Sequence, residues 1–277
     1  MTYRDILVHV PLQDPEGQIE VAVALAKDFS AHLTGVCSLP ETAMLRSALD
    51  SPFLRFDQEE VDERIRQEYA RATAAEAAFT AAAKKAGISY SWITGEGDPA
   101  DVLVHACRLC ELAVVEQCNL ASELLWGPAV QLALSDYPTL VVPNGWREPV
   151  LPHRALIAWN GSAQAAAAVR SALPLLERAE AVTVVRGPSR ETFPAAMRVP
   201  SIDILSYLER HGIKAAVKEP EIPDDEAGER ILAVAKEVGA DRVVMGAFGR
   251  SRFKEWVLGG ATRYVLEHMT VPVFMAH

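Results

Sequence analysis

Four glycines punctuate one segment near the C-terminal end of the chain, at a spacing that could hold a phosphate group. The segment covers residues 246 to 262 and contains Gly246, Gly249, Gly259 and Gly260, followed by a pattern typical of a helix. Glycine lets the backbone approach a ligand closely, and free N–H groups at the start of a helix attract anions. The sequence therefore predicts a phosphate-binding loop in this segment.

Two common phosphate-binding motifs do not fit this loop. A P-loop would continue into Gly-Lys-Ser or Gly-Lys-Thr, and a dinucleotide fingerprint would follow the first strand of its domain. Here the loop follows an apolar run at residues 241–245, the fourth strand-like run of its half. Open α/β sheets bind ligands beyond the carboxyl ends of their strands, so the position of the loop agrees with its chemistry.

An internal repeat indicates which elements position the loop. The apolar runs Ile6–Val10 and Ala155–Trp159 each open a half that continues with an Ala-rich helical segment and further alternating strands and helices. Such alternation predicts parallel strands joined by crossover helices on both faces of a sheet. We expect an α/β fold of two tandem domains, residues 1–147 and 148–277, each with an open, twisted, parallel five-stranded sheet.

The loop and the repeat together resemble the universal stress protein family. Gly246, Gly249 and Gly259 match the spacing of the nucleotide-binding motif in its ATP-binding members, and Trp159-Asn-Gly-Ser162 is similar to the family's Asp-Gly-Ser after the first strand. The resemblance covers both halves as an order of elements, and the second half also by motif. It implies a Rossmann-like fold of the adenine-nucleotide alpha hydrolase type, and a stress-response binding module that holds ATP or ADP in its second domain.

The resemblance also assigns roles to residues of the second half. Gly246 would lie near the ribose, backbone N–H groups of the later glycines would meet the phosphates, and the adenine would rest against the strand end near Val184–Arg186. Asn160 would approach the sugar or a metal, and Ser162 is expected to cap the next helix. The nucleotide-binding residues implied are Ala158, Asn160, Val185, Met245, Gly246, Gly249, Arg250, Gly259, Gly260, Ala261 and Thr262.

Two positions depart from the family pattern. Gly260 stands where Ser or Thr is usual, so one hydroxyl donor is absent, and Thr262 is the candidate to replace it. Asn160 stands where Asp is usual, which keeps hydrogen-bonding capacity but removes a charge that would help to hold Mg²⁺ beside the nucleotide. Arg250, adjacent to Gly249, is expected to contact phosphate ahead of Arg252 and Lys254, which could instead be solvated loop residues.

The first half lacks the corresponding features. Its segment 116–128 has neither the Gly-x2-Gly spacing nor a glycine pair, and His9-Val-Pro-Leu12 stands where the family has Asp-Gly-Ser. We predict that this half does not bind nucleotide as the second half does. The resemblance further implies that Thr139–Val142 and Val273–Met275 pack together in an internal pseudo-dimer, with a homodimer of chains as a further expectation.

Composition and residue spacing limit the kinds of partner, location and site that the chain can have. A net charge of −10 disfavours nucleic acid and anionic membrane surfaces, and no apolar run approaches the roughly 20 residues of a membrane-spanning helix, so we expect a cytoplasmic protein. The Cys107-x-x-Cys110 pair is interpreted as two packed residues near a helix end rather than as a redox or zinc motif. The histidines show no metal-ligand spacing, and no catalytic or metal-binding residue is assigned.

Three functions stay open beside regulated nucleotide binding. Slow ATP hydrolysis or nucleotidyl transfer would use the same phosphate donors, although the sequence offers no evident general base. A scaffold that has lost nucleotide in both halves would fit the departures at Gly260 and Asn160. An apolar pocket could instead take another small ligand.

Overall fold

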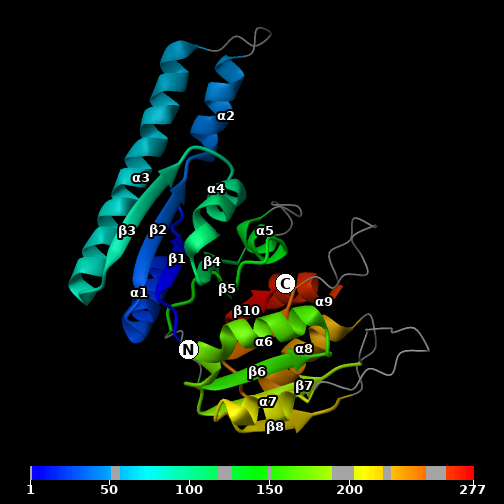
Figure 1. Ribbon diagram of the computed structural model, residues 1–277. Helices are drawn as coiled ribbons and strands as arrows, with labels where there is room; N and C mark the ends of the chain where they lie inside the picture. The colour runs from blue at the N-terminus through cyan, green and yellow to red at the C-terminus, as the bar shows by residue number, and fades with distance from the viewer. Residues whose placement is uncertain are drawn as a thin grey trace.

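The computed structural model describes residues 2–50, 57–117, 127–148, 151, 153–188, 203–220, 226–247 and 260–277. These residues form two halves, each built of alternating strands and helices (Figure 1). None of the described helices has the length and apolar character that a bilayer crossing requires.

The first half contains the elements up to residue 142. They are β1 (Asp5–His9), α1 (Glu16–Phe29), β2 (His32–Ser38), α2 (Pro40–Leu49), α3 (Gln58–Ala86), β3 (Tyr90–Gly95), α4 (Pro99–Ala106), the 3₁₀ turn η1 (Cys107–Leu109), β4 (Leu112–Glu116), α5 (Pro128–Leu134) and β5 (Thr139–Val142).

The second half repeats this order with a single described helix in the place of α2 and α3. Its elements are β6 (Arg154–Trp159), α6 (Ala163–Leu176), β7 (Ala181–Arg186), α7 (Ile204–Arg210), β8 (Ala215–Lys218), α8 (Ala227–Glu237), β9 (Arg242–Gly246), α9 (Gly260–His268) and β10 (Val273–Ala276).

All ten strands belong to one continuous sheet in the order β3-β2-β1-β4-β5-β10-β9-β6-β7-β8. Within each half the strands are parallel, and β5 pairs with β10 in antiparallel fashion where the halves meet. The predicted α/β class with parallel five-stranded halves is confirmed. The two sheets are joined edge to edge rather than separate, because each half ends in a short apolar strand whose free edge pairs with the other.

The contact between β5 and β10 is nearly symmetric. Leu140 pairs with Phe274, and these residues occupy the same place in their halves, since β5 pairs with β4 as β10 pairs with β9. Both side chains are buried. The predicted packing of Thr139–Val142 against Val273–Met275 is therefore confirmed.

Helices cover both faces of the sheet and bury its alternating apolar side chains. One core packs α1, α3, α6 and α7 against residues such as Val8, Leu140 and Val244, and it runs through both halves. The opposite core packs α4, α5, α8 and α9 against residues such as Val115 and Met245. Successive side chains of a strand point to opposite faces of a sheet, so alternate residues enter the two cores when both faces are covered.

The largest difference between the halves is the pair α2 and α3, which projects beyond the sheet in Figure 1. The sequence predicts a long helix over residues 56–86, and α3 fills almost all of it. Asp57 caps its start by accepting from the Glu59 N–H, and Gly87 ends it in a left-handed conformation with φ of 70°. The buried Glu68 carboxylate accepts from the Glu41 and Thr42 N–H groups and so caps α2.

Candidate functional site

Three of the residues implied by sequence lie across neighbouring strands at the carboxyl edge of the second half. Ala158 on β6 pairs with Val185 on β7 and with Met245 on β9. The side chains share the face covered by α8 and α9; those of Val185 and Met245 are buried, and Ala158 is half-buried. Any contact of Val185 or Met245 with a ligand would therefore come through the backbone.

Gly246, the last residue of β9, lies directly against the first turn of α6. A Cβ atom at this position would come within 2.5 Å of the Ala165 backbone nitrogen and 2.6 Å of the Gln164 carbonyl carbon. Both atoms belong to helix backbone and cannot swing away, so only glycine fits. Close packing against α6 therefore requires the first glycine of the motif, Gly246, independently of the ligand contact that the resemblance implies.

The turn between β6 and α6 is organised by its own polar groups. The Asn160 side-chain oxygen accepts from the Ser162 N–H at 3.1 Å, and Gly161 has φ of 78°, in the left-handed region. The Ser162 hydroxyl accepts from the Ala165 N–H at 3.2 Å and caps α6, as its sequence context predicts. The Asn160 side-chain oxygen is therefore already engaged in a hydrogen bond within the turn.

The helix that follows the glycine-rich segment begins at Gly260. Among the described residues, an added Cβ at Gly260 would meet no atom within 4 Å. Ala261 packs against α8, where Gly228 makes room: a Cβ there would lie 2.8 Å from the Ala261 oxygen. Thr262, the candidate replacement for the absent hydroxyl, is only 4% exposed.

The middle of the predicted loop lies outside the described residues. This applies to Gly249 and Gly259 and to the cations Arg250, Arg252 and Lys254. Their assignment to the phosphates stays a prediction from the sequence.

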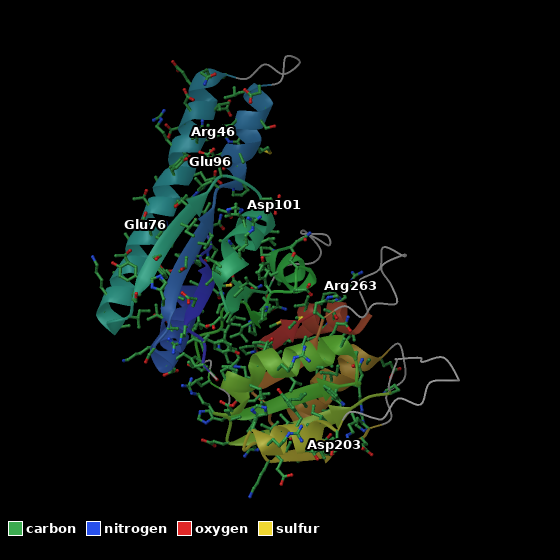
Figure 2. All side chains as sticks on the ribbon, in the orientation of Figure 1. Arg46, Glu76, Glu96, Asp101, Asp203 and Arg263 are labelled. Atoms are coloured by element: carbon green, nitrogen blue, oxygen red, sulfur yellow. The ribbon has the colours of Figure 1, made fainter. Side chains whose placement is uncertain are left out.

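Two described cations near this edge are paired with carboxylates. Arg263 on α9, labelled in Figure 2, places its Nε 2.8 Å from an oxygen of Glu267 one turn later. Arg186 at the end of β7 bonds an oxygen of Glu219 at 3.0 Å. Such exposed pairs are weak, so either arginine could exchange its carboxylate for a phosphate at little cost.

A polar link joins this edge to the first half, and sequence reasoning did not find it. Gln164, 6% exposed in the first turn of α6, lies 3.5 Å from His277 between Nε2 atoms. The other ring nitrogen of His277 lies 3.2 Å from an oxygen of Asp136, just before β5. Only the antiparallel pairing of β5 and β10 brings these residues together, and no local motif signals it.

The comparisons with known proteins agree with this architecture. The model of the universal stress protein family matches residues 152–277. A universal stress protein from Archaeoglobus fulgidus has a similar structure, with a TM-score of 0.69 at 17% identity over 98% of this chain and 95% of its own. A protein of unknown function from Pseudomonas aeruginosa matches with a TM-score of 0.58 at 15% identity, over 99% and 92% of the two chains.

No curated protein sequence matches the chain. At these identities the structural likeness shows the fold, while the family assignment rests on the match to the second half. Residues 152–277 belong to the universal stress protein family, and the chain is a tandem protein in which this fold occurs twice.

Proposed function

We propose that the second half binds an adenine nucleotide, ATP or ADP, at the carboxyl edge of β6, β7 and β9, and that the protein acts as a regulatory binding module in a stress response. One observation carries the proposal. The chain leaves β9 at Gly246, which is pressed against α6, and enters α9 at Gly260, where an added Cβ would meet no atom of the described residues within 4 Å.

The chemistry of the described residues supports this choice. The start of α9 supplies backbone donors and a positive dipole end, which favour a phosphate. The strand ends at Ala158 and Val185 lie next to an apolar surface, which suits a purine ring. Because the chain carries a net charge of −10, phosphate must be held by such local donors and not by bulk attraction.

The turn at Asn160 bears on the role of Mg²⁺. Its side-chain oxygen already accepts from the Ser162 N–H, and an amide is a weaker ligand for a hard cation than a carboxylate. We therefore expect Mg²⁺ to contribute through the phosphates of the nucleotide more than through this side chain. Binding would then depend only modestly on the metal.

Isothermal titration of the whole chain with ATP, ADP and AMP, with and without Mg²⁺, tests the proposal. Gly249→Asp puts a carboxylate into the predicted phosphate cradle and should weaken binding by about tenfold or more. Asn119→Asp is the matched control, because it introduces the same charge three residues after β4 ends, as Gly249 lies three residues after β9 ends. It should leave the affinity unchanged.

The same titration separates the alternatives. An absence of heat with every nucleotide would contradict the proposal and favour a scaffold or another ligand. Steady phosphate release that disappears in Gly249→Asp would instead assign slow hydrolysis to the same site.

A further inference from the structure

The Cys107-x-x-Cys110 segment lies at a helix end, as predicted, with Cys107 in the core and Cys110 packed against it. Helix α4 ends at Ala106, and Cys107 opens the 3₁₀ turn η1. Cys110 follows the turn with extended backbone, at φ of −89° and ψ of 151°, and its N–H donates to the Cys107 oxygen at 3.0 Å. The two cysteines therefore stand at the ends of a closed turn.

A closed turn of this kind places the two thiols where they can react with each other. Its first and fourth Cα atoms lie within about 7 Å, and a disulfide spans Cα atoms about 4.4–6.8 Å apart. A disulfide between Cys107 and Cys110 thus needs little movement of the backbone.

The surroundings give the two sulfur atoms different roles. The hydrogen bond from the Cys107 thiol and the backbone N–H groups of Cys110 and Leu112 lower the pKa of Cys110. The same hydrogen bond, together with burial, raises the pKa of Cys107, whose side chain is fully buried. Since the thiolate is the nucleophile, Cys110 is the sulfur that attacks first and Cys107 the one that resolves.

The turn is also open to a partner. Leu109, between the cysteines, is 90% exposed, the largest exposure among the large apolar residues that the structure describes. The second half differs at this place, just before β9: α8 ends at Glu237, Gly239 follows with φ of 63°, and the buried Ala240 stands in the position of Cys110. The fold itself therefore requires neither the thiols nor the exposed leucine.

We propose that Cys107 and Cys110 form a reversible dithiol–disulfide site that exchanges with low-molecular-weight disulfides of the glutathione class. The Cys110 thiolate attacks one sulfur of the glutathione disulfide, forms a mixed disulfide and releases one glutathione thiolate. The Cys107 thiol loses its proton, and its sulfur attacks that of Cys110 and expels the second glutathione. Two protein thiols become one disulfide, and one glutathione disulfide becomes two thiols.

The experiment equilibrates the reduced full-length chain with defined mixtures of reduced and oxidised glutathione, blocks free thiols by alkylation and digests with trypsin. Cleavage after Arg108 puts Cys107 and Cys110 into separate peptides, which stay joined only by a disulfide. No Lys or Arg separates Cys110 from Cys118, so Cys118→Ser is the matched control. The joined peptide should appear in the original chain and in Cys118→Ser and be absent in Cys110→Ser.

Two further measurements distinguish a preorganised dithiol site from non-specific oxidation of the cysteines. Cys107→Ser should trap one glutathione on Cys110, whereas Cys110→Ser should leave Cys107 at least about tenfold slower to react because it is buried. The equilibrium for the joined peptide should also be at least about tenfold more favourable in the native chain than in urea, because the turn holds the thiols together. Circular dichroism checks that each variant folds.

The proposal is overturned by any of three results. These are no joined peptide at any glutathione ratio, a joined peptide that is lost in Cys118→Ser, or equal equilibria in the native and denatured chains.

Discussion

The two halves share one fold and differ at the edge where a ligand would bind. Glu116 ends β4 and pairs with Val142, just as Gly246 ends β9 and pairs with Ala276. The connection from β1 to α1 covers residues 10–15, whereas β6 reaches α6 through residues 160–162 only. The short turn before α6 places this helix against the end of β9, where only glycine fits. The longer connection before α1 leaves room for the Glu116 side chain at the end of β4.

In the first half, a buried carboxylate caps the start of α2. The Glu68 carboxylate occupies the start of α2, at 3.1 Å from the Glu41 nitrogen and 2.6 Å from the Thr42 nitrogen. In the second half α9 starts at Gly260, where an added Cβ would meet no atom of the described residues within 4 Å. The two copies therefore share their strand packing, while the described helix starts at α2 and α9 have different surroundings.

The contact between the halves is expected to carry the largest effect. Phe274→Ala should lower the free energy of unfolding by about 3–5 kcal/mol, because it empties a fully buried position. Its counterpart Leu140→Ala should cost about 2–5 kcal/mol. Urea denaturation followed by circular dichroism measures both, and a loss below about 1 kcal/mol for either would show that the β5–β10 contact is not a shared core.

The next largest effect is expected at Gly246, the glycine at the end of β9. Gly246→Ala should destabilise the chain by about 1–3 kcal/mol, because the new Cβ overlaps backbone atoms of α6. Gly260→Ala is the matched control, since its Cβ would meet no atom of the described residues within 4 Å and should change stability by less than about 1 kcal/mol. Equal effects in thermal unfolding would contradict the close packing of α6 on β9.

A histidine makes the first half sensitive to acid. His9 stands on β1 where Ala158 stands on β6, and burial lowers the pKa of His9 to about 4. Folding then favours the neutral ring, so its contribution is complete above pH 6.5 and is lost as the pH falls from 6.5 toward 4. On the order of 2 kcal/mol should disappear over this window.

His9→Ala tests this contribution. Urea titrations at a series of pH values should show a shallower decline between pH 6.5 and 4 in the variant than in the original chain. Parallel curves would mean that His9 does not titrate with folding.

The smallest effect concerns a hydrogen bond across the two halves. The Gln117 side-chain nitrogen donates to the Leu266 carbonyl at 2.7 Å near the end of α9. Gln117→Ala should cost about 1 kcal/mol, since an end carbonyl loses its donor. Hydrogen exchange should show faster opening of the last turn of α9, and unchanged exchange there would contradict the capping role.

Much of the fold could be predicted from the sequence because its signals are local. Apolar runs such as Ile6–Val10, helical segments and the final proline-containing strands repeat in order, and parallel strands follow from that alternation. The edge pairing was accessible only through the family resemblance. The strand bounds were less certain: the apolar patterns predict strands from Ile88 and from Ile213, whereas β3 and β8 begin two residues later, at Tyr90 and Ala215.

The site could be predicted only in part. Glycine spacing singled out Gly246, but not its packing against α6, which depends on how a helix far away in sequence is placed. The link from Gln164 through His277 to Asp136 crosses the halves and leaves no local pattern. The packing of Cys107 and Cys110 at a helix end was predicted, but the 3₁₀ turn between them was not.

Photolabelling with an azido analogue of ATP tests the difference between the halves most directly. The whole chain is irradiated with the analogue, digested and mapped by mass spectrometry, with excess ATP as competitor. We predict competed adducts confined to the second half, near the ends of β7 and β9 and the start of α9. Competed adducts in the first half near Ser38 or Glu116, or none that ATP suppresses, would contradict a single nucleotide site built on Gly246 and Gly260.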